Sequence, residues 1–398
     1  MKPRIGLFLG ASPEWGGAFQ YNQSMLDAVA ALPAESFETV VAYRHECWER
    51  LLTGYRVSNF RISPGLAGKA AGVIWERLKL PLAWRRRICP YFHPVARALI
   101  GARCDLWIFP SQDHWTYEIP VPSLGVVFDL MHRYARRFPE VSENGEFERR
   151  EIHYAAMCRW ARSILVESET GKRQLMECYG IDGDRVHVLP TVAPRYMYSS
   201  EIPAGFAERY RLPVKYVFYP AQFWEHKNHQ RLIRAAASLM EKIPNLQLVF
   251  AGGKKNGFDA VLQLVQTLRL SDNVHFLGYV PDADMPELYR RARALVMPSF
   301  FGPTNIPPLE AFVAGCPVAI SGIYGMPQQV GDAALLFDPN SEAEIADCIY
   351  RLWTDDDLCA GLAQKGLAMA KGWNQDHFNQ RLREILSRVI GAGRDSTN

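Results

Sequence analysis

The residues best suited to chemistry lie in the segment 297–317, in which an apolar run, a glycine-containing loop and a second apolar segment follow one another. This order predicts a strand, a loop and a helix that begins at Pro307 and Pro308 and ends at Gly315. A helix start attracts phosphate, because its free N–H groups coincide with the positive end of the helix dipole. Glu310 falls in the predicted first turn, where it would repel a phosphate, so we expect it to accept hydrogen bonds from hydroxyls such as those of a ribose. The segment therefore predicts a nucleotide-diphosphate site.

A lysine in an earlier polar loop could complete this site. Lys227 lies in the loop 222–229, and the loop 302–306 offers backbone donors. A cation near a diphosphate stabilises the charge that develops on the leaving group as a glycosidic bond breaks. A solvated lysine, and a helix-capping carboxylate at Glu310, are the structural alternatives. His226 and His229 lie three residues apart and could hint at a metal, but no further pair of ligands accompanies them, so we expect no metal site.

Paired glycines and a polar cluster mark the first half of the chain. Gly16 and Gly17 follow the first apolar run, and such glycines let backbone approach a bulky anion closely, although a plain turn also explains them. Asp129 and His132 follow the apolar run 124–128 and would lie at the carboxyl edge of a sheet, where open α/β sheets bind ligands. A turn that caps a helix is the alternative for these two residues.

Alternating strands and helices would position these residues. The predicted strands are 5–10, 37–43, 104–109, 124–128, 164–166 and 186–189 in the first half, and 216–219, 246–250, 274–276, 294–296 and 317–321 in the second. Helical stretches separate them, which predicts a parallel sheet covered on both faces in each half, with the carboxyl-edge loops of both sheets facing a central cleft. Beyond Ser341 the chain is predicted to be helical to about Val389.

The predicted domains follow from this alternation and from a linker rich in proline and tyrosine at 190–213. We predict an N-terminal Rossmann-like domain over 1–195 and a C-terminal one over 196–375, which would hold the nucleotide diphosphate. The remaining residues, 376–398, are expected to form a helix that packs back on the N-terminal domain and a frayed tail from 391 onward.

Composition narrows the class of protein. A chain of 398 residues with 48% hydrophobic side chains can build two cores, and a net charge of only +3 argues against nucleic-acid binding. Eight cysteines without a Cys-x-x-Cys pair indicate reduced thiols in a cytoplasmic protein. The stretch 75–88 combines two tryptophans with five basic residues, which predicts a peripheral contact at the inner membrane face; a solvated surface helix fits it equally well.

The segments 301–311 and 315–318 (Phe-Gly-Pro-Thr-Asn-Ile-Pro-Pro-Leu-Glu-Ala and Gly-Cys-Pro-Val) resemble the donor-site signature of retaining glycosyltransferases of family four, which have the GT-B fold. The segment 278–289 is similar to that family's base-contacting segment. This resemblance implies transfer of a sugar from a nucleotide-sugar donor to an acceptor hydroxyl with retention of configuration, without a metal or other cofactor.

The resemblance implies that 1–195 is the acceptor-side domain and 196–375 the nucleotide-sugar-binding domain. It also assigns roles to individual residues. Lys227 would hold the diphosphate, Glu310 would hold the ribose, and Val280 would meet the base through its backbone. The other positions that it implies are Gly16 and Gly17 near the phosphates or acceptor, Gln222 and Gly302 in the donor site, Thr304, Asn305 and Ile306 as N–H donors, and Asp129 and His132 beside the catalytic centre.

Three residues depart from that family's pattern. Gly302 stands where the first of two glutamates is usual, Gln222 where an arginine is usual, and Phe128 where a histidine is usual. The departures predict either a subgroup in which neutral side chains supply the donor contacts, or a chain that has lost catalysis. We favour the subgroup, because the lysine and the second glutamate remain.

The resemblance thus implies a hexosyltransferase of the mannose or rhamnose type that acts in surface polysaccharide synthesis, such as that of O-antigen or lipopolysaccharide. A GDP-sugar is slightly preferred over a UDP-sugar as donor, and a glycan or a lipid-linked sugar is the expected acceptor. The alternatives are a non-catalytic nucleotide-sugar-binding protein and a nucleotide-sugar epimerase of the same fold.

Overall fold

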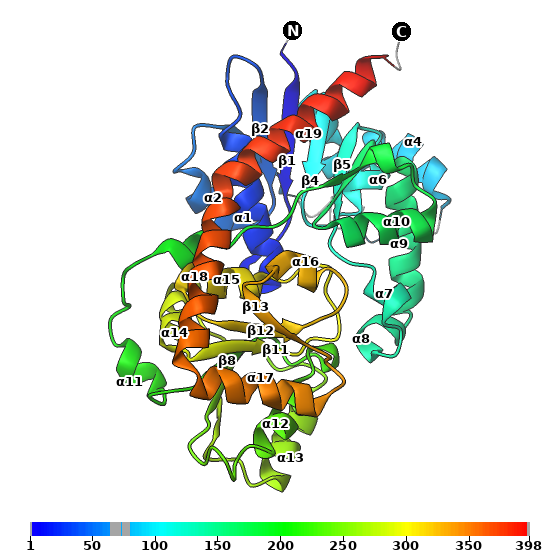
Figure 1. Ribbon diagram of the computed structural model, residues 1–398. Helices are drawn as coiled ribbons and strands as arrows, with labels where there is room; N and C mark the ends of the chain where they lie inside the picture. Colours follow the sequence, from blue (N-terminus) through cyan, green and yellow to red (C-terminus); the bar gives the residue numbers. More distant parts are fainter. Residues whose placement is uncertain (1, 64–72, 74–79, 396–398) are drawn as a thin grey trace. The chain divides into compact units, whose positions relative to one another are not determined.

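The computed structural model describes residues 2–63, 73 and 80–395. Its internal contacts divide the chain into two compact units (Figure 1). Unit 1 comprises Met1–Leu130, Glu148–Thr191 and Gln375–Asn398, and unit 2 comprises Met131–Phe147 and Val192–Asn374. Each unit therefore contains segments that are far apart in the sequence.

Unit 1 is built on a parallel sheet with the strand order β3-β2-β1-β4-β5-β6-β7. Its strands are β1 (Arg4–Leu9), β2 (Glu38–Tyr43), β3 (Ser58–Arg61), β4 (Leu106–Phe109), β5 (Ser123–Val127), β6 (Ser163–Val166) and β7 (Val186–Val188). The central strands β4 and β5 are buried along their whole length, as expected of a sheet that helices cover on both faces.

The described helices of unit 1 include a long C-terminal one. They are η1 (Pro13–Trp15), α1 (Gly17–Ala30), α2 (Glu46–Leu52), α4 (Leu82–Phe92), α5 (Pro94–Gly101), α6 (Trp115–Glu118), α9 (Glu146–Trp160), α10 (Glu169–Tyr179), η2 (Gly183–Arg185) and α19 (Gln375–Asp395). The last of these packs against α1 (Figure 1), where the rings of Tyr21 and Phe378 lie 6.0 Å apart. The frayed tail predicted from 391 onward is wrong as far as Asp395, since α19 continues to that residue.

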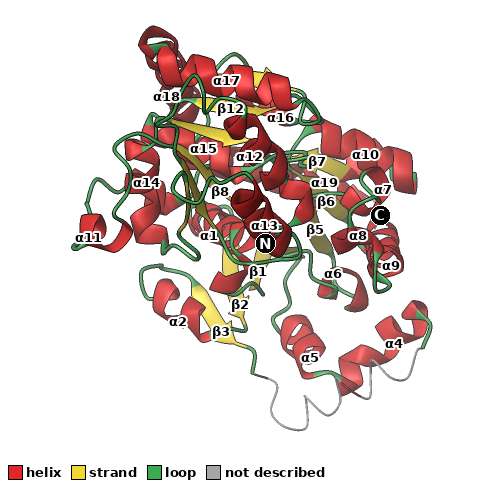
Figure 2. Cartoon of the chain, turned by 90° about the horizontal axis from the view of Figure 1, so that it is seen from below, coloured by secondary structure: helices red, strands yellow, loops and turns green. Residues whose placement is uncertain are grey.

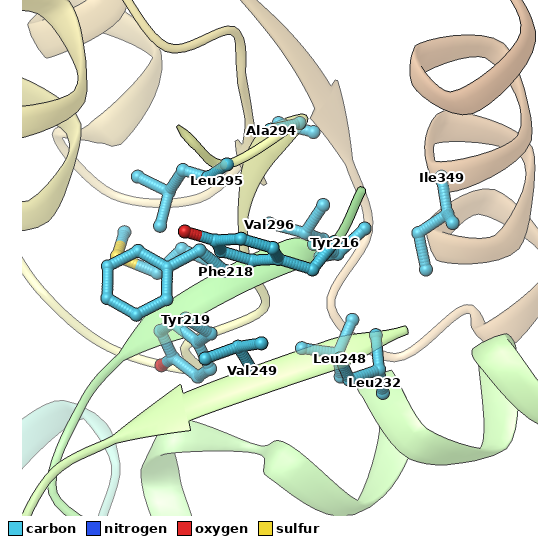
Figure 3. Close-up of a cluster of buried hydrophobic side chains, with 14 of the residues drawn as sticks. Tyr216, Phe218, Tyr219, Leu232, Leu248, Val249, Ala294, Leu295, Val296 and Ile349 are labelled. Atoms are coloured by element: carbon cyan, nitrogen blue, oxygen red, sulfur yellow. The ribbon is translucent and has the colours of Figure 1, made fainter. Parts of the chain in front are cut away.

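Unit 2 is built on a second parallel sheet, with the order β10-β9-β8-β11-β12-β13. Its strands are β8 (Val217–Pro220), β9 (Leu248–Ala251), β10 (Val274–Phe276), β11 (Ala294–Met297), β12 (Val318–Ser321) and β13 (Ala334–Phe337). Figure 3 shows its core, in which Phe218, Leu248 and Val296 have no exposed surface. The strands β9, β11 and β12 are buried along their whole length, so they read as continuous apolar runs in the sequence.

The structure describes further helices in unit 2, several of which lie against this sheet (Figure 2). They are α7 (Met131–Tyr134), α8 (Pro139–Ser142), η3 (Arg195–Tyr198), α11 (Phe206–Tyr210), η4 (Glu225–Lys227), α12 (His229–Ala237), α13 (Phe258–Thr267), η5 (Asp282–Asp284), α14 (Met285–Arg291), α15 (Ile306–Ala314), α16 (Met326–Val330), α17 (Glu342–Thr354) and α18 (Asp356–Gly372). The helical region predicted beyond Ser341 is thus three helices, α17, α18 and α19, because breaks fall at Asp355 and at 373–374.

The predicted membrane-contact stretch 75–88 is only partly within the described residues, because 75–79 lie outside them. In its described part, α4 exposes 63% of Trp84, while Arg85 pairs with Glu118 and Arg86 donates to the carbonyl of Tyr117. Two of the basic side chains are therefore engaged inside unit 1, and the membrane contact stays a prediction. None of the helices in the described part of the chain is long and apolar enough to cross a bilayer.

Candidate functional site

The strand order of unit 2 creates a switch point between β8 and β11, where the chain winds outward in both directions. In open parallel sheets, ligands bind beyond the carboxyl ends of the strands at such a point. Two loops leave the sheet there, 221–228 after β8 and 298–305 after β11. They carry Gln222 and Lys227 on one side and residues 302–305 on the other, so the fold of unit 2 brings the predicted donor residues to one edge.

Lys227 ends the short helix η4 and is fixed by its neighbours. The hydroxyl of Tyr219 donates to the Lys227 carbonyl at 3.0 Å. Asn228 adopts a left-handed conformation with φ of 61°, and its buried amide donates to the carbonyls of Pro298 and Pro339, both at 2.9 Å. Asn228 thereby ties the lysine loop to the ends of β11 and β13. The sequence offers a signal for this role, since asparagine tolerates the left-handed region better than most residues.

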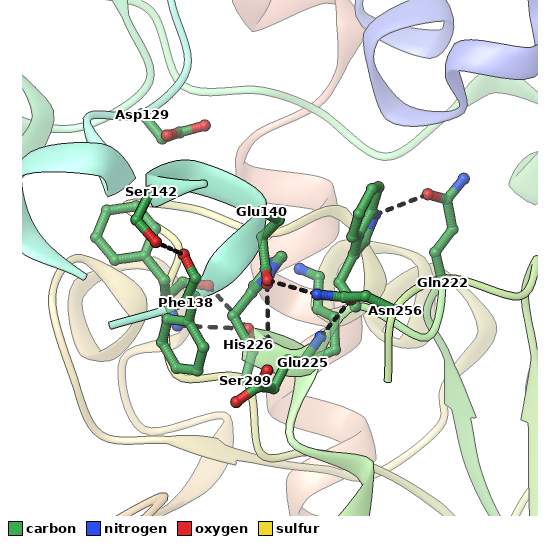
Figure 4. A network of polar contacts seen from close by, with 12 residues as sticks. Asp129, Phe138, Glu140, Ser142, Gln222, Glu225, His226, Asn256 and Ser299 are labelled. Atoms are coloured by element: carbon green, nitrogen blue, oxygen red, sulfur yellow. Dashed lines mark hydrogen bonds and ion pairs between the residues drawn. The ribbon is translucent and has the colours of Figure 1, made fainter. Parts of the chain in front are cut away.

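A buried ion pair holds the same loop from the other side (Figure 4). A carboxylate oxygen of Glu140 lies 2.5 Å from His226 Nδ1 and accepts the His226 backbone N–H at 3.1 Å. The second oxygen accepts the amide of Asn256 at 2.9 Å. The Glu140 side chain is 6% exposed and that of His226 is 13% exposed. The segment 131–147 therefore helps to position Lys227, which the sequence did not indicate.

The helix start of α15 differs from the predicted one. The helix begins at Ile306 with Asn305 as its N-cap, so Glu310 is its fifth residue. The prediction that Glu310 lies in the first turn is therefore wrong. Pro307 and Pro308 have no N–H, and the N–H of Asn305 donates to Gln329 at 2.9 Å. The N–H of Ile306 is therefore the main backbone donor that the first turn can offer to a phosphate.

A glutamine from α16 clasps this helix start. Gln329 Oε1 accepts the Asn305 N–H at 2.9 Å, and Gln329 Nε2 donates to the Asn305 carbonyl at 2.6 Å. Only an amide side chain can both accept and donate in this way. Gln329 is a positioning residue that the sequence analysis missed, because nothing local distinguishes it from an exposed helical glutamine.

Replacing Gln329 by glutamate should destabilise the protein by about 1–3 kcal/mol, because a carboxylate cannot donate to the Asn305 carbonyl and leaves that acceptor unpaired. Chemical denaturation at neutral pH measures the change. Gln263→Glu, the same substitution at an exposed position of α13, should have little effect. Equal stabilities of the two variants would show that the clasp does not hold α15.

Gly302 and Asn305 form a tightly packed pair within the loop after β11. Gly302 has φ of +152°, a conformation that side chains rarely adopt, and a Cβ there would lie 2.3 Å from Asn305 Nδ2. That Nδ2 is buried and has no hydrogen-bond partner, although Asn305 is the N-cap. The backbone conformation and the position of the asparagine therefore favour glycine at 302, where the resemblance had placed a glutamate, and the Asn305 Nδ2 is left as an unused donor.

Glu310 is buried, with 4% of its surface exposed, and both its oxygens are engaged. One accepts the hydroxyl of Tyr196 and the other that of Tyr289, the latter at 2.6 Å. Burial raises the pKa of Glu310, and the two tyrosine hydrogen bonds act against this shift. A carboxylate has about four lone-pair positions, so ribose hydroxyls would share Glu310 with these tyrosines.

The ends of β8, β9 and β10 converge beside this site. Gly252 has φ of +146° and donates to the carbonyl of Gly278 at 2.7 Å, and a Cβ at Gly252 would meet the Ala221 carbonyl at 2.3 Å. Val280 is buried, whereas the adjacent Tyr279 is 74% exposed. Because the Val280 side chain is buried, a base would contact the backbone of this residue. The exposed Tyr279 ring is an additional candidate for stacking on a base.

Gln222 stands where an arginine was expected from the resemblance. Its Oε1 accepts the indole N–H of Trp224 at 3.0 Å (Figure 4). The Gln222 Nε2 makes no hydrogen bond within the described residues, so it can donate to a ligand. The Gln222 amide can thus serve as a neutral donor in place of the charged arginine expected from the resemblance.

The remaining predicted residues lie elsewhere. Gly16 has φ of 54° and open space around it at the N-cap of α1, and Gly17 begins that helix. Asp129 accepts a hydrogen bond from Arg150 at 3.0 Å within unit 1. His132 belongs to unit 2 and is fully buried against the ring of Phe147, at 5.5 Å between ring centres. Phe128, where the family pattern has a histidine, packs edge-on against Tyr21.

The described residues contain no group of three or more His, Cys, Asp or Glu side chains that could hold a metal ion. Thr304, the last of the predicted donor residues, is half-buried in the loop before the Asn305 N-cap. The contacts within unit 2 thus provide a cation, one helix-start N–H, two unused amide groups and a buried carboxylate. This set suits a nucleoside diphosphate that carries a sugar.

Residues 207–369 match the family described as glycosyl transferases group 1. Among curated proteins, the O-antigen chain mannosyltransferase B of Escherichia coli is 28% identical over 298 residues, which cover 71% of this chain and 76% of that protein. The D-inositol 3-phosphate glycosyltransferase of Nocardia farcinica is 28% identical over 269 residues, which cover 63% of this chain and 60% of that protein.

Solved structures share the fold. HepE of Anabaena, in complex with UDP and glucose, aligns with a TM-score of 0.72 at 17% identity over 96% of this chain and 99% of its own. WaaG, a glycosyltransferase involved in lipopolysaccharide biosynthesis, aligns with a TM-score of 0.65 at 19% identity over 96% of this chain and 99% of its own. The predicted fold class, GT-B with two Rossmann-like parallel-sheet domains, is confirmed.

Proposed function

We propose that the chain is a retaining glycosyltransferase, which moves a hexose from a nucleotide sugar to a glycan or lipid-linked acceptor in surface polysaccharide synthesis. The match of residues 207–369 to the glycosyl transferases group 1 family supports this proposal. The observation that carries this proposal is the placement of Lys227 and the start of α15 at the switch point between β8 and β11. The similarity to an O-antigen mannosyltransferase favours mannose and hence a GDP-sugar.

The donor would lie along the carboxyl edge of the unit 2 sheet. The diphosphate would contact the Lys227 ammonium and the Ile306 N–H, which stabilise the charge that builds on the leaving phosphate. The ribose hydroxyls would share the carboxylate of Glu310, and the base would meet the backbone at Val280. The neutral amides of Gln222 and Asn305 would replace the charged groups of other members of the family.

In this mechanism no protein nucleophile is needed. The acceptor hydroxyl attacks the anomeric carbon on the face from which the diphosphate leaves, and the departing phosphate oxygen takes the hydroxyl proton. Lys227 keeps its own proton and acts by charge alone. Asp129 and His132 are proposed to assist near the acceptor, and Gly16 and Gly17 to allow its close approach.

A thermal-shift screen with GDP-, UDP-, ADP- and dTDP-sugars tests the donor. A ligand that binds only the folded protein raises its melting temperature, and we expect the largest rise with GDP-mannose. UDP-glucose is the second donor to compare, since HepE binds UDP and glucose. Binding without transfer to any acceptor would support the non-catalytic alternative, and isomerisation of the donor without acceptor would support an epimerase.

Replacing Lys227 by alanine should weaken donor binding by about tenfold or more, because a charge-assisted hydrogen bond contributes about 1.5–3 kcal/mol. Titration calorimetry with the donor found in the screen measures the change. Lys254→Ala, which removes an exposed lysine over the ring of Phe258, is the control and should change affinity by about twofold at most. Equal affinities of both variants would remove Lys227 from the site.

A further inference from the structure

Unit 1 contains a basic pocket that none of the roles above uses. It has a volume of about 460 Å³ and lies between the start of β6, the segment from η2 to β7, and α19. Ser163 and Val186 line it and are the first residues of β6 and β7, so the pocket opens at the amino edge of the sheet. Sugar-nucleotide ligands of this fold class bind at the opposite, carboxyl edge. We propose that this pocket is a binding site for a phosphate group.

The charge of the lining supports an anionic ligand. Arg162, Lys172 and Arg388 line the pocket from β6's amino end, α10 and α19. Within the described residues none of these three forms an ion pair, and the acidic side chain in the lining is that of the exposed Asp184. The cations in the lining outnumber this one carboxylate and repel one another, and a bound anion relieves that repulsion.

One wall of the pocket is rigid. Arg185 donates from Nη2 to the carbonyls of Cys158 and Ala161, at 2.8 and 2.5 Å, and from Nε to that of Arg162 at 3.2 Å. These carbonyls end α9, and they hold the guanidinium in place without neutralising its charge. Arginine fixed in this way binds phosphate with little loss of side-chain entropy.

A histidine in the lining can report on the ligand. His187 Nε2 is buried and has no hydrogen-bond partner. Burial lowers the pKa of His187, the positive charges of Lys172, Arg388 and Arg381 lower it further, and Asp184 acts in the opposite direction. A phosphate in the pocket would reverse this field and accept a hydrogen bond from the protonated ring, so occupancy would raise the pKa of His187.

NMR of the full chain with labelled histidine tests the proposal. Titration with inorganic phosphate should move the His187 resonances and raise its pKa. The double variant K172A/R388A should weaken phosphate binding by about tenfold or more. The double variant R173A/R383A removes the same charge from exposed positions of the same two helices, and it should bind nearly as the original chain does. Lys227→Ala should leave the His187 response unchanged, which separates this pocket from the donor site.

Vesicles identify the source of the phosphate. If vesicles of phosphatidylglycerol, but not of phosphatidylcholine, move the His187 resonances and K172A/R388A abolishes this effect, the ligand is a lipid headgroup. A response to inorganic phosphate alone assigns a soluble phosphate compound. The proposal is overturned if neither probe affects His187, or if both double variants lose binding equally, since the latter result would reflect only the overall charge.

Discussion

Replacing Glu140 by alanine should lower the free energy of unfolding by about 3–5 kcal/mol, because it leaves three partners, the His226 ring, the His226 N–H and the Asn256 amide, without their acceptor. The carboxylate lies 2.5 Å from His226 Nδ1 and also accepts hydrogen bonds from the His226 N–H and from Asn256. Donor binding should fall as well, since this contact positions the loop that carries Lys227. Chemical denaturation and donor titration measure the two effects.

Acid should reproduce part of this loss. Burial alone would raise the pKa of Glu140, but hydrogen bonds from His226, from its own backbone and from Asn256 outweigh burial and hold the pKa at about 2. A carboxyl whose pKa is lowered in the folded protein stabilises the fold at any pH above its unfolded-state pKa of 4.5. It loses that contribution as the pH falls from 4.5 toward about 2. The loss should amount to about 3 kcal/mol over this range.

The control is Glu143→Ala, which removes an exposed carboxylate from the same segment and should change stability by less than about 0.5 kcal/mol. Glu140→Ala should also flatten the acid dependence of stability between pH 4.5 and 2. An unaltered acid profile, or a loss no larger than that of the control, would contradict the role given to this ion pair.

Introducing glutamate at Gly302, where the resemblance placed one, should not improve the proposed donor site. We expect it to destabilise the protein by about 2–4 kcal/mol and to remove the melting-temperature rise caused by the donor. The backbone has φ of +152° at this position, and any Cβ would lie 2.3 Å from Asn305 Nδ2 and 2.9 Å from its Cγ. The change would displace the N-cap of α15 and with it the Ile306 N–H.

Two further variants separate the causes. Gly253→Ala changes a glycine with no atom near its missing Cβ and should have little effect on stability or binding. The double variant G302E/N305G removes the steric clash but keeps the backbone strain, so it should recover only part of the stability. Thermal denaturation with and without donor measures both. If Gly302→Glu bound the donor more tightly, the coupling between Gly302 and Asn305 would be disproved.

Much of the architecture could be read from local pattern. Eleven predicted strands correspond to strands in the structure. Ser168 is the N-cap of α10, where its hydroxyl accepts the N–H of Gly171, and serine is a preferred residue at this position. Two strands were missed. The edge strand β3 is mostly exposed and shows no apolar alternation, and β13 is short and partly exposed, so neither carried the signal that buried strands give.

The sequence alone determined the fold class and the kinds of groups in the proposed donor site, because the periodicity of the strands and the residue types of the loops are local. Tertiary structure decided how those groups are held. The contacts of Asn305 with Gln329, His226 with Glu140, and Glu310 with Tyr196 join residues 24, 86 and 114 positions apart. Side-chain partners at such separations are set by the packing of the sheet and its helices, which no local pattern records.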